Sequence, residues 1–310
     1  ERWIDTMVQA YAHGLPGGLD KIGEILGLAP EEAKDKRGRE LINLFCKPMP
    51  KNRALRRATR ETHPVEWAEF LEYSRQDIVA MRAISKKLPR WNYWIGKKDW
   101  HLWHIDQRIN DRGMQVDLHL ADAAVEAVDK EQKRLKLRVS EATGEIVDSA
   151  SRRDLLLAFI CAEYGVDLPD LRADTVRRRL EDPDLPQGVK ELLSIRLEAT
   201  RTSTAKYKAL INSASADSRL RNTRQFMGAS RTGRFAHRLF QPGNLPRPNM
   251  LGHEIEFGIE RLLAGDADAW FGDVINLSAN AIRGCIVAPP GRKIVVADYS
   301  NIEGRGLAFL

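Results

Sequence analysis

The part of the chain that most restricts its fold is residues 293–310, where a short apolar run meets a charged turn. The Pro-Pro-Gly sequence at 289–291 predicts a turn, and residues 294–297 predict a buried strand after it. Asp298 then stands at the end of that strand. A carboxylate in this position is poorly placed for packing in a core, but it is well placed to hold a divalent cation through its oxygens.

A helix is expected shortly after Asp298, with Ser300 or Asn301 as a suitable N-cap. The apolar positions of this helix are Ile302, Leu307 and Phe309. Glu303 adds a second carboxylate five positions beyond Asp298, which strengthens the interpretation as a cation site. The alternative is a surface strand-to-helix turn in which Asp298 only caps the helix.

Residues 298–303, with Arg305 after them, resemble the first catalytic motif of the family A DNA polymerases, the group of bacterial DNA polymerase I and many phage replicases. The usual form of that motif is Asp-Tyr-Ser-Gln-Ile-Glu-x-Arg. The resemblance implies that Asp298 would ligate two Mg²⁺ ions and that the Tyr299 carbonyl would help to hold one of them. It also implies that Glu303 would lie beside the sugar 2′ position and disfavour ribonucleotides.

Composition agrees with a soluble DNA-binding protein. The net charge of +6 and a pI near 9.2 favour a polyanionic partner, and 43% apolar and 30% charged residues are ordinary for a globular chain. Cys46, Cys161 and Cys285 lack metal-ligand spacing and are expected to be small core residues in a reducing, cytoplasmic compartment. No membrane-spanning run or signal peptide is found. Because the chain starts at Glu1 and ends at Leu310 inside an expected helix, we expect a fragment.

Residues 1–95 resemble the C-terminal part of a proofreading 3′–5′ exonuclease domain, whose fold is ribonuclease H-like. Residues 67–79 predict a helix on which Tyr73 and Asp77 share one face. Their Tyr-x-x-x-Asp spacing resembles the third motif of such domains, in which the Asp ligates a metal and the Tyr positions the attacking water. The other ligands would lie before residue 1, so an inactive half-site is expected, with Asp5 as a helix cap or a structural residue.

Two clusters each allow two interpretations. The basic loop at 47–60 is either a solvated surface or a phosphate contact. A dense aromatic cluster either forms a core at a domain junction or stacks on single-stranded bases, and the core is favoured because large aromatic side chains dominate burial. The members of this cluster are Trp91, Tyr93, Trp94, Trp100 and Trp103.

Residues 96–215 resemble the polymerase thumb. A long helix is expected at about 120–142, and its basic face is either laid along duplex DNA or simply solvated. That face carries Lys130, Lys133, Arg134, Lys136 and Arg138. A second long helix, expected at 189–211, resembles the one by which the family's thumb holds the primer–template backbone, since its polar groups suit phosphate contacts. Its residues of interest are Arg196, Arg201, Ser203, Thr204, Lys206 and Tyr207.

Residues 216–310 resemble the first part of the polymerase palm, an incomplete antiparallel sheet. Thr232, Arg234 and the later Asn244 match the family's Thr-Gly-Arg … Gln-Asn-Ile-Pro element. The resemblance implies that Arg234 reaches the minor groove near the primer terminus, where all base pairs present similar acceptors. Gly243 stands where the family has Gln, so the template contact made by that Gln is not carried over.

The expected protein is therefore mainly α with α+β parts, and part of a DNA-directed DNA polymerase used in replication or repair. Its reaction would be attack of a primer 3′-hydroxyl on the α-phosphate of a deoxynucleoside triphosphate, with two Mg²⁺ ions as cofactors. Its partners would be primer–template DNA, deoxynucleoside triphosphates and the rest of the polymerase chain, with no membrane; no processivity factor is indicated. Since one Asp cannot hold two cations, residues 1–310 alone are expected not to polymerise. The alternatives are a non-catalytic DNA-binding helical module of polymerase ancestry and part of a proofreading exonuclease only.

Overall fold

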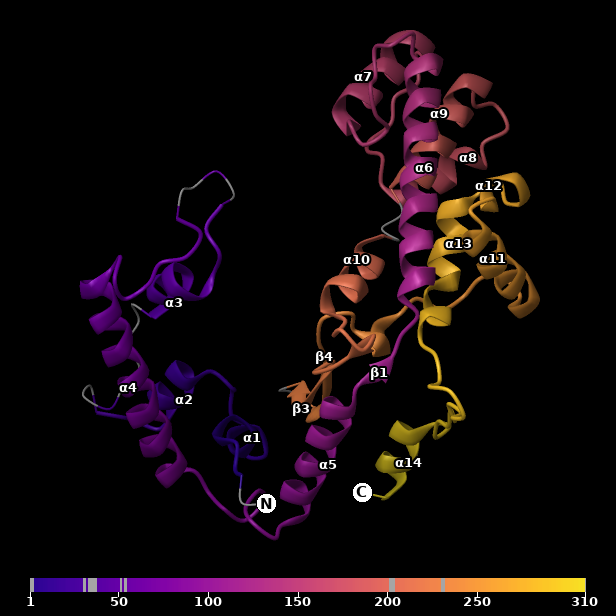
Figure 1. Ribbon diagram of the computed structural model, residues 1–310. Helices are drawn as coiled ribbons and strands as arrows, with labels where there is room; N and C mark the ends of the chain where they lie inside the picture. Colours follow the sequence, from indigo (N-terminus) through magenta and orange to yellow (C-terminus); the bar gives the residue numbers. More distant parts are fainter. Residues whose placement is uncertain are drawn as a thin grey trace. The chain divides into compact units, whose positions relative to one another are not determined.

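The computed structural model describes residues 3–29, 32, 38–50, 52, 55–200, 204–229 and 232–309. The chain forms two compact units, one of Glu1–Asp111 with Arg224–Arg238 and one of Arg112–Thr223 with Leu239–Leu310. Helices dominate both units, and the strands among the described residues form two small antiparallel sheets (Figure 1). The prediction of a mainly helical protein with small antiparallel sheets is confirmed. The division into three functional domains stays a prediction.

The first unit consists of helices that follow one another along the chain and a hairpin contributed by a later segment. Its elements are α1 (Thr6–Tyr11), α2 (Leu19–Ile25), α3 (Gly38–Cys46), α4 (Pro64–Lys87), α5 (Lys98–Arg112), β3 (Arg224–Ala229) and β4 (Arg234–His237), and only the last residue of α5, Arg112, belongs to the second unit. Asp5 caps α1 as predicted, because its Oδ1 accepts hydrogen bonds from the backbone N–H groups of Met7 at 2.8 Å and Val8 at 3.2 Å.

The aromatic cluster forms a core, which was the favoured interpretation. Its buried members pack with residues of α1 and β3, and the set is Val8, Tyr93, Trp100, Trp103 and Phe226. The indole Nε1 of Trp100 donates a 2.8 Å hydrogen bond to the Trp3 carbonyl, so the buried ring keeps a polar partner. Trp91 is 68% exposed and does not belong to this core.

The second unit contains most of the helices and the other small sheet. Its elements are β1 (Met114–Gln115), α6 (Leu118–Ala142), α7 (Arg153–Tyr164), α8 (Ala173–Leu180), α9 (Gln187–Ala199), α10 (Thr204–Ser213), β2 (Arg219–Leu220), the 3₁₀ turn η2 (Pro242–Asn244), α11 (Gly252–Ala264), α12 (Ala267–Trp270), α13 (Val274–Ala281), the 3₁₀ turn η3 (Ile282–Cys285) and α14 (Ile302–Phe309). Strands β1 and β2 pair antiparallel, with Met114 opposite Leu220.

Helix α6 contributes to two cores of the second unit. Its buried residues recur at spacings of three and four, and they are Leu120, Ala121, Ala124, Val128, Glu131, Leu135 and Val139. The first three belong to a core with α10, α11 and α13. Val128, Leu135 and Val139 belong to a second core with α7, α8 and α9. The expected helix at 120–142 is confirmed, and its apolar stripe is more complete than the sequence indicated.

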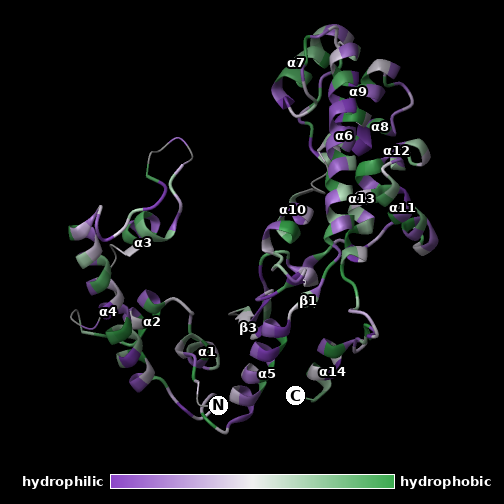
Figure 2. Ribbon diagram, viewed as in Figure 1, coloured by the Kyte–Doolittle hydropathy of each residue, from purple (hydrophilic) through white to green (hydrophobic). Residues whose placement is uncertain are grey.

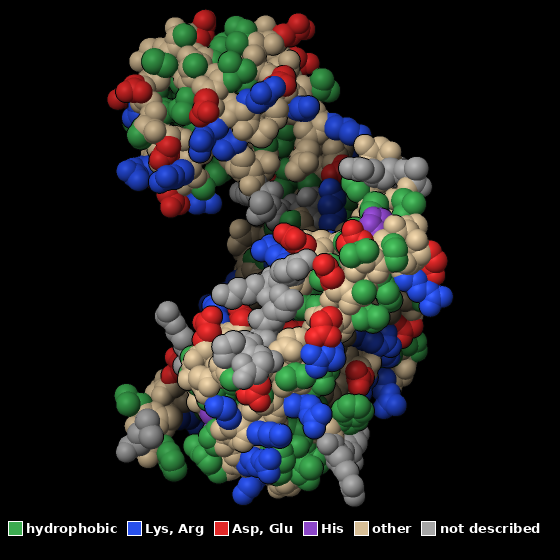
Figure 3. Space-filling view, turned by 90° about the vertical axis from the view of Figure 1, so that its left-hand side faces the viewer, with side chains coloured by type: hydrophobic (Ala, Val, Ile, Leu, Met, Phe, Trp, Pro, Cys, Tyr) green, Lys and Arg blue, Asp and Glu red, His purple; other side chains and the backbone are tan. Residues whose placement is uncertain are grey.

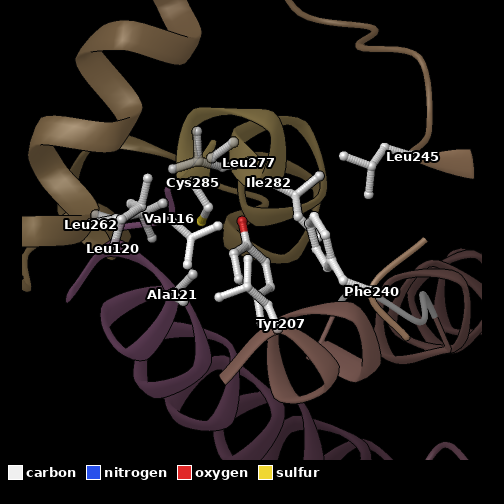
Figure 4. Packing of buried hydrophobic residues seen from close by; sticks show 14 of the residues in the cluster. Val116, Leu120, Ala121, Tyr207, Phe240, Leu245, Leu262, Leu277, Ile282 and Cys285 are labelled. Atoms are coloured by element: carbon white, nitrogen blue, oxygen red, sulfur yellow. The ribbon is translucent and has the colours of Figure 1, made fainter. Parts of the chain in front are cut away.

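Tyr207 lies in the middle of the first of these cores (Figure 4). Its side chain is fully buried, and its hydroxyl donates a 2.6 Å hydrogen bond to the backbone carbonyl of Ser278. Burial raises the pKa of this hydroxyl. Tyr207 is therefore a core residue, and its grouping with DNA-contacting residues is wrong, because a fully buried side chain cannot reach a phosphate.

The single long helix expected at 189–211 is wrong, because the structure has two helices there, α9 and α10. Helix α9 ends at Ala199, and the Thr200 hydroxyl bonds to the Arg196 carbonyl at 2.8 Å. The type of residue at position 200 explains why α9 ends there. β-Branched and hydroxyl side chains disfavour a helix interior, since they lose rotamer freedom or bond to the backbone.

The buried strand expected at 294–297 is also wrong. These residues have no regular secondary structure, and Val295 and Val296 are 87% and 88% exposed. A strand needs a partner for its backbone groups, and no strand among the described residues pairs with this segment. Helix α14 begins at Ile302, directly after Asn301, as predicted. The apolar residues of α14, whose ribbon is partly green in Figure 2, are exposed as well.

Only one of the three cysteines is a core residue. Cys285 is buried, whereas Cys46 and Cys161 are exposed, so the prediction for these two is wrong. Each of them follows a core residue, Phe45 or Ile160, by one position. One position rotates a helical side chain by about 100°, which is enough to turn it away from the core. Separately, none of the helices in the described part of the chain has the length and apolar content that a membrane crossing requires.

We expect Tyr207→Phe to lower the free energy of unfolding by about 1 kcal/mol, because the substitution removes the hydrogen bond to Ser278 but keeps the packing. Urea denaturation followed by circular dichroism measures this change. Tyr299→Phe is the matched control, since Tyr299 is 76% exposed, and it should leave stability within about 0.5 kcal/mol. Equal effects of the two substitutions would contradict the buried hydrogen bond.

Candidate nucleic-acid and metal site

The residues of the predicted catalytic motif lie in the C-terminal segment of the second unit. Asp298 is exposed in the irregular segment before α14, and Glu303 is exposed in the first turn of that helix. Tyr299 is exposed beside Asp298. Within the described part of the chain, no hydrogen bond or ion pair holds the Asp298 carboxylate. Both carboxylates are thus open to solvent, and neither belongs to an apolar core.

The two carboxylates do not make a complete two-metal site. Holding two cations at the spacing needed for in-line displacement requires several oxygen ligands from the protein. Among the described residues, no group of three or more His, Cys, Asp or Glu side chains lies close enough together to hold a metal ion. Asp298 and Glu303 therefore fit part of a magnesium site, and the described residues do not fit the whole of it.

The predicted minor-groove residues are divided between the two units. Arg234 begins β4 of the first unit and is exposed, and Thr232 is exposed in the turn before it. The Thr232 N–H donates a 3.0 Å hydrogen bond to the Ala229 carbonyl, which helps to close the hairpin. Asn244 belongs to η2 of the second unit, where its Nδ2 donates to Gln241 at 3.4 Å. The structure therefore places Asn244 in a different unit from Thr232 and Arg234.

A buried ion pair fixes the β3–β4 hairpin to α5. Asp106 is 1% exposed, and its Oδ1 accepts from Arg224 Nη2 at 2.6 Å and Nε at 3.1 Å. Asn110 completes the arrangement, because its side chain bonds to the Asp106 carboxylate at 3.2 Å and to the Arg224 carbonyl at 3.0 Å. The Arg224 guanidinium also lies over the Phe235 ring, 4.6 Å from its centroid. We call Asp106, Asn110 and Arg224 the hairpin clamp.

The sequence interpretation missed the hairpin clamp. Asp106 and Asn110 are four positions apart, so their sharing of one helix face was readable. Their partner Arg224 is 118 positions beyond Asp106, and no local pattern connects the two. The clamp matters for the candidate site because Phe235, which packs on Arg224, is the neighbour of Arg234 in the sequence.

The predicted thumb residues have several different environments. Arg196 is tied to the loop before α7, since its Nη1 donates to the Ala150 carbonyl at 2.7 Å. Burial, and secondarily the charge of Arg153, lowers the pKa of the Arg196 guanidinium. Lys206 Nζ contacts the Phe240 carbonyl at 3.4 Å. Two predicted residues, Arg201 and Ser203, lie outside the described residues, as does the side chain of Thr204, which begins α10.

The basic face of α6 is largely paired with carboxylates. The ion pairs are Lys130 with Asp268 at 2.8 Å, Arg134 with Glu131 at 2.6 Å and Arg138 with Glu191 at 3.0 Å. Lys133 and Lys136 instead line an open hollow of about 430 Å³ together with Ser149 and Ser151. On the surface that Figure 3 displays, basic and acidic side chains lie close to one another. Only part of this helix face is therefore available to a polyanion.

The predicted exonuclease pair is split between core and surface. Tyr73 is 6% exposed and packs in a small core with α3, where a Cβ atom on Gly38 would lie 2.0 Å from the tyrosine ring. Asp77 is half-buried, and its Oδ1 accepts no hydrogen bond from the described residues. The basic loop of 47–60 contains Lys51 and Arg53, which lie outside the described residues. The role of this half-site stays a prediction.

We expect Asp106→Ala to lower the free energy of unfolding by about 2–4 kcal/mol, because it leaves the Arg224 guanidinium and the Asn110 amide without their buried acceptor. Urea denaturation measures the loss. Asp217→Ala is the matched control: Asp217 pairs with Arg221 at 2.6 Å but its side chain is 50% exposed, so the expected loss of stability is much smaller than that at Asp106. A loss at Asp106 no larger than that at Asp217 would show that the hairpin clamp is not important for stability.

Comparison with known proteins finds similarity to a DNA polymerase. No protein-family model matches the chain, and no solved structure matches it. A DNA polymerase of Bacillus phage SP02 is 31% identical to it over 315 aligned residues. The alignment covers 100% of this chain and 47% of the phage protein, so the chain spans about half the length of the curated relative that it matches. The chain is therefore a distant homologue of part of a phage DNA polymerase.

Proposed function

We propose that this chain is part of a family A DNA-directed DNA polymerase that acts in DNA replication or repair. The observation that carries the proposal is the similarity to the phage polymerase, which extends over the whole of this chain rather than over one motif. The motif at 298–305 supports the proposal independently, because its carboxylates are exposed to solvent and so accessible to a substrate. The positive net charge of +6 suits a DNA partner.

The proposed reaction forms a bond between the primer 3′-oxygen and the α-phosphorus of a deoxynucleoside triphosphate. The bond from that phosphorus to the bridging oxygen breaks, and pyrophosphate leaves. Asp298 and the Tyr299 carbonyl would supply oxygen ligands for Mg²⁺, and further carboxylates would have to come from outside residues 1–310. Glu303 would lie beside the sugar 2′ position, where a hydroxyl group would be disfavoured.

Primer–template DNA would be held by residues of both units. Arg234, with Thr232, would meet the minor groove near the primer end, and the exposure of the hairpin turn suits that role. Asn244 would contact the template side. The thumb residues would contact backbone phosphates without reading sequence, and they are Arg196, Arg201, Ser203, Thr204 and Lys206. For Arg196 this contact would require its bond to the Ala150 carbonyl to be exchanged for one to a phosphate.

A second candidate function is a non-catalytic DNA-binding module of polymerase ancestry. It is favoured by one observation, which is that the described residues bring no three metal-ligating side chains together. A proofreading exonuclease alone receives less support, because Tyr73 is largely buried and Asp77 would need further carboxylates from outside this chain.

In a polypeptide that contains this chain and the rest of the polymerase, Asp298→Ala should reduce primer extension by at least about a hundredfold, because a cation ligand is lost. Affinity for primer–template DNA, measured by fluorescence anisotropy, should stay within about twofold of that of the parent protein. The reason is that the substitution leaves the interactions that bind substrate and transition state equally well. Asp154→Ala is the matched control, because the Asp154 side chain is 91% exposed on α7, and it should not alter extension. Unchanged extension by Asp298→Ala, or none by the parent protein, would favour the non-catalytic module.

Residues 1–310 on their own should bind primer–template DNA and fail to extend it, because the carboxylates described here do not complete a two-metal site. Anisotropy with a labelled primer–template and a gel assay with all four deoxynucleoside triphosphates test the two parts separately. Binding should weaken steeply as salt is raised, as expected for phosphate contacts. Extension of the primer by this chain alone would contradict the expectation.

A further inference from the structure

The second unit contains an open hollow of about 760 Å³ beside the β1–β2 sheet, which we call the basic hollow. Its walls are β1 with the adjoining end of α5, one residue of β2, and the irregular segment 286–294. Four of the lining residues are cationic, namely Arg112, Arg219, Arg292 and Lys293, and no lining residue is acidic. The volume lies within the range of pockets that hold small organic ligands, about 300–1,000 Å³.

Main-chain hydrogen bonds hold the walls of the basic hollow together. The Val287 N–H donates to the Gln115 carbonyl at 3.1 Å, so the irregular segment runs beside β1. Gly113 turns the chain from α5 into β1 with φ of 67°, and a Cβ atom there would lie 2.6 Å from the Leu220 carbonyl. Glycine is therefore needed where the wall bends. The hollow is built by the backbone and does not depend on the position of α14.

The positive charges of the basic hollow are only slightly compensated. Arg219 is fixed by the backbone, because its Nη1 donates to the Arg112 carbonyl at 3.2 Å and to the Gly113 carbonyl at 3.5 Å. The carboxylate nearest to it, Asp217, is 4.0 Å away and binds Arg221 through both oxygens at 2.6–2.8 Å. The side chains of Arg112, Arg292 and Lys293 make no ion pair within the described part of the chain. Like charges gathered in this way favour a bound polyanion.

We propose that the basic hollow binds a segment of single-stranded nucleic acid. Arg292 and Lys293 would contact successive phosphates, with Arg112 on the other wall. Met114 and Ile286 give the lining an apolar surface against which a sugar or base can lie. A free nucleotide offers the same phosphate chemistry, but cations on opposite walls of an open hollow suit a chain that continues past it. The inference goes beyond the polymerase proposal, because it uses none of the residues of the catalytic motif.

The test is fluorescence anisotropy of labelled (dT)₁₂ with residues 1–310 at several salt concentrations. The double substitution Arg292→Glu with Lys293→Glu should weaken binding by at least about a hundredfold, as expected when two charged hydrogen bonds to phosphate are lost. It should also reduce the salt slope by about 1.4, or 0.7 for each phosphate contact. Both residues are exposed and lie outside regular secondary structure, so the fold should be retained, which circular dichroism checks.

The matched control is Arg82→Glu with Lys86→Glu, which makes the same change in net charge on the exposed face of α4 in the other unit. Its effect on binding should be less than about twofold, since neither residue lines the basic hollow. Equal weakening by the two double variants, or none by either, would overturn the proposal. Displacement of (dT)₁₂ by dTTP at similar affinity would overturn the assignment to a strand. The polymerase proposal is tested by primer extension and the basic hollow by (dT)₁₂ binding, so failure of one is distinguishable from failure of the other.

Discussion

The second unit depends on one amphipathic helix that buries its stripe in two different cores. Helix α6 can do so only because Glu131, which is 2% exposed within that stripe, is neutralised by Arg134 three positions later. The pair is bidentate, with distances of 2.6 and 2.8 Å, and the arginine remains half-exposed. Burial of the Glu131 carboxylate without that partner would cost folding free energy. The ion pair is therefore a condition for packing α6 into both cores. Helices α9, α10, α11, α12 and α13 of the same unit pack against α6.

The sequence predicted elements whose formation depends on local periodicity. Its predictions failed for elements whose formation depends on residues far away in the sequence. The helix at 120–142 was readable because buried apolar positions recur on one face of it. The helix at 189–211 was predicted too long, because α9 ends at Ala199 and a separate helix, α10, begins at Thr204. The strand at 294–297 has the right composition, but a strand is defined by its neighbours, and the described residues provide none.

The candidate site shows the same division. Asp298 and Glu303 were found from their spacing, and the structure places both on an accessible surface. Their residue types suggest a cation, but whether a site is complete depends on groups far away in the sequence. The hairpin clamp and the basic hollow were both missed for this reason. Arg112 and Arg292 are 180 positions apart and share one hollow only because the backbone near Gln115 pairs with Val287.

The hairpin clamp has a consequence for the polymerase proposal. By sequence order, Arg234 was assigned with Asp298 to a palm, but its hairpin packs in the first unit. Its position is then determined by α5, through the buried carboxylate of Asp106. Two hydrogen bonds from the Arg224 guanidinium and one from the Asn110 amide compensate for the removal of this carboxylate from water. Such an anchor is rigid, since a shift of the hairpin would leave Asp106 buried and unpaired. If Arg234 tests the primer end, a rigid anchor suits that task. A side chain can distinguish a correct from an incorrect base-pair geometry only if it does not move to fit both.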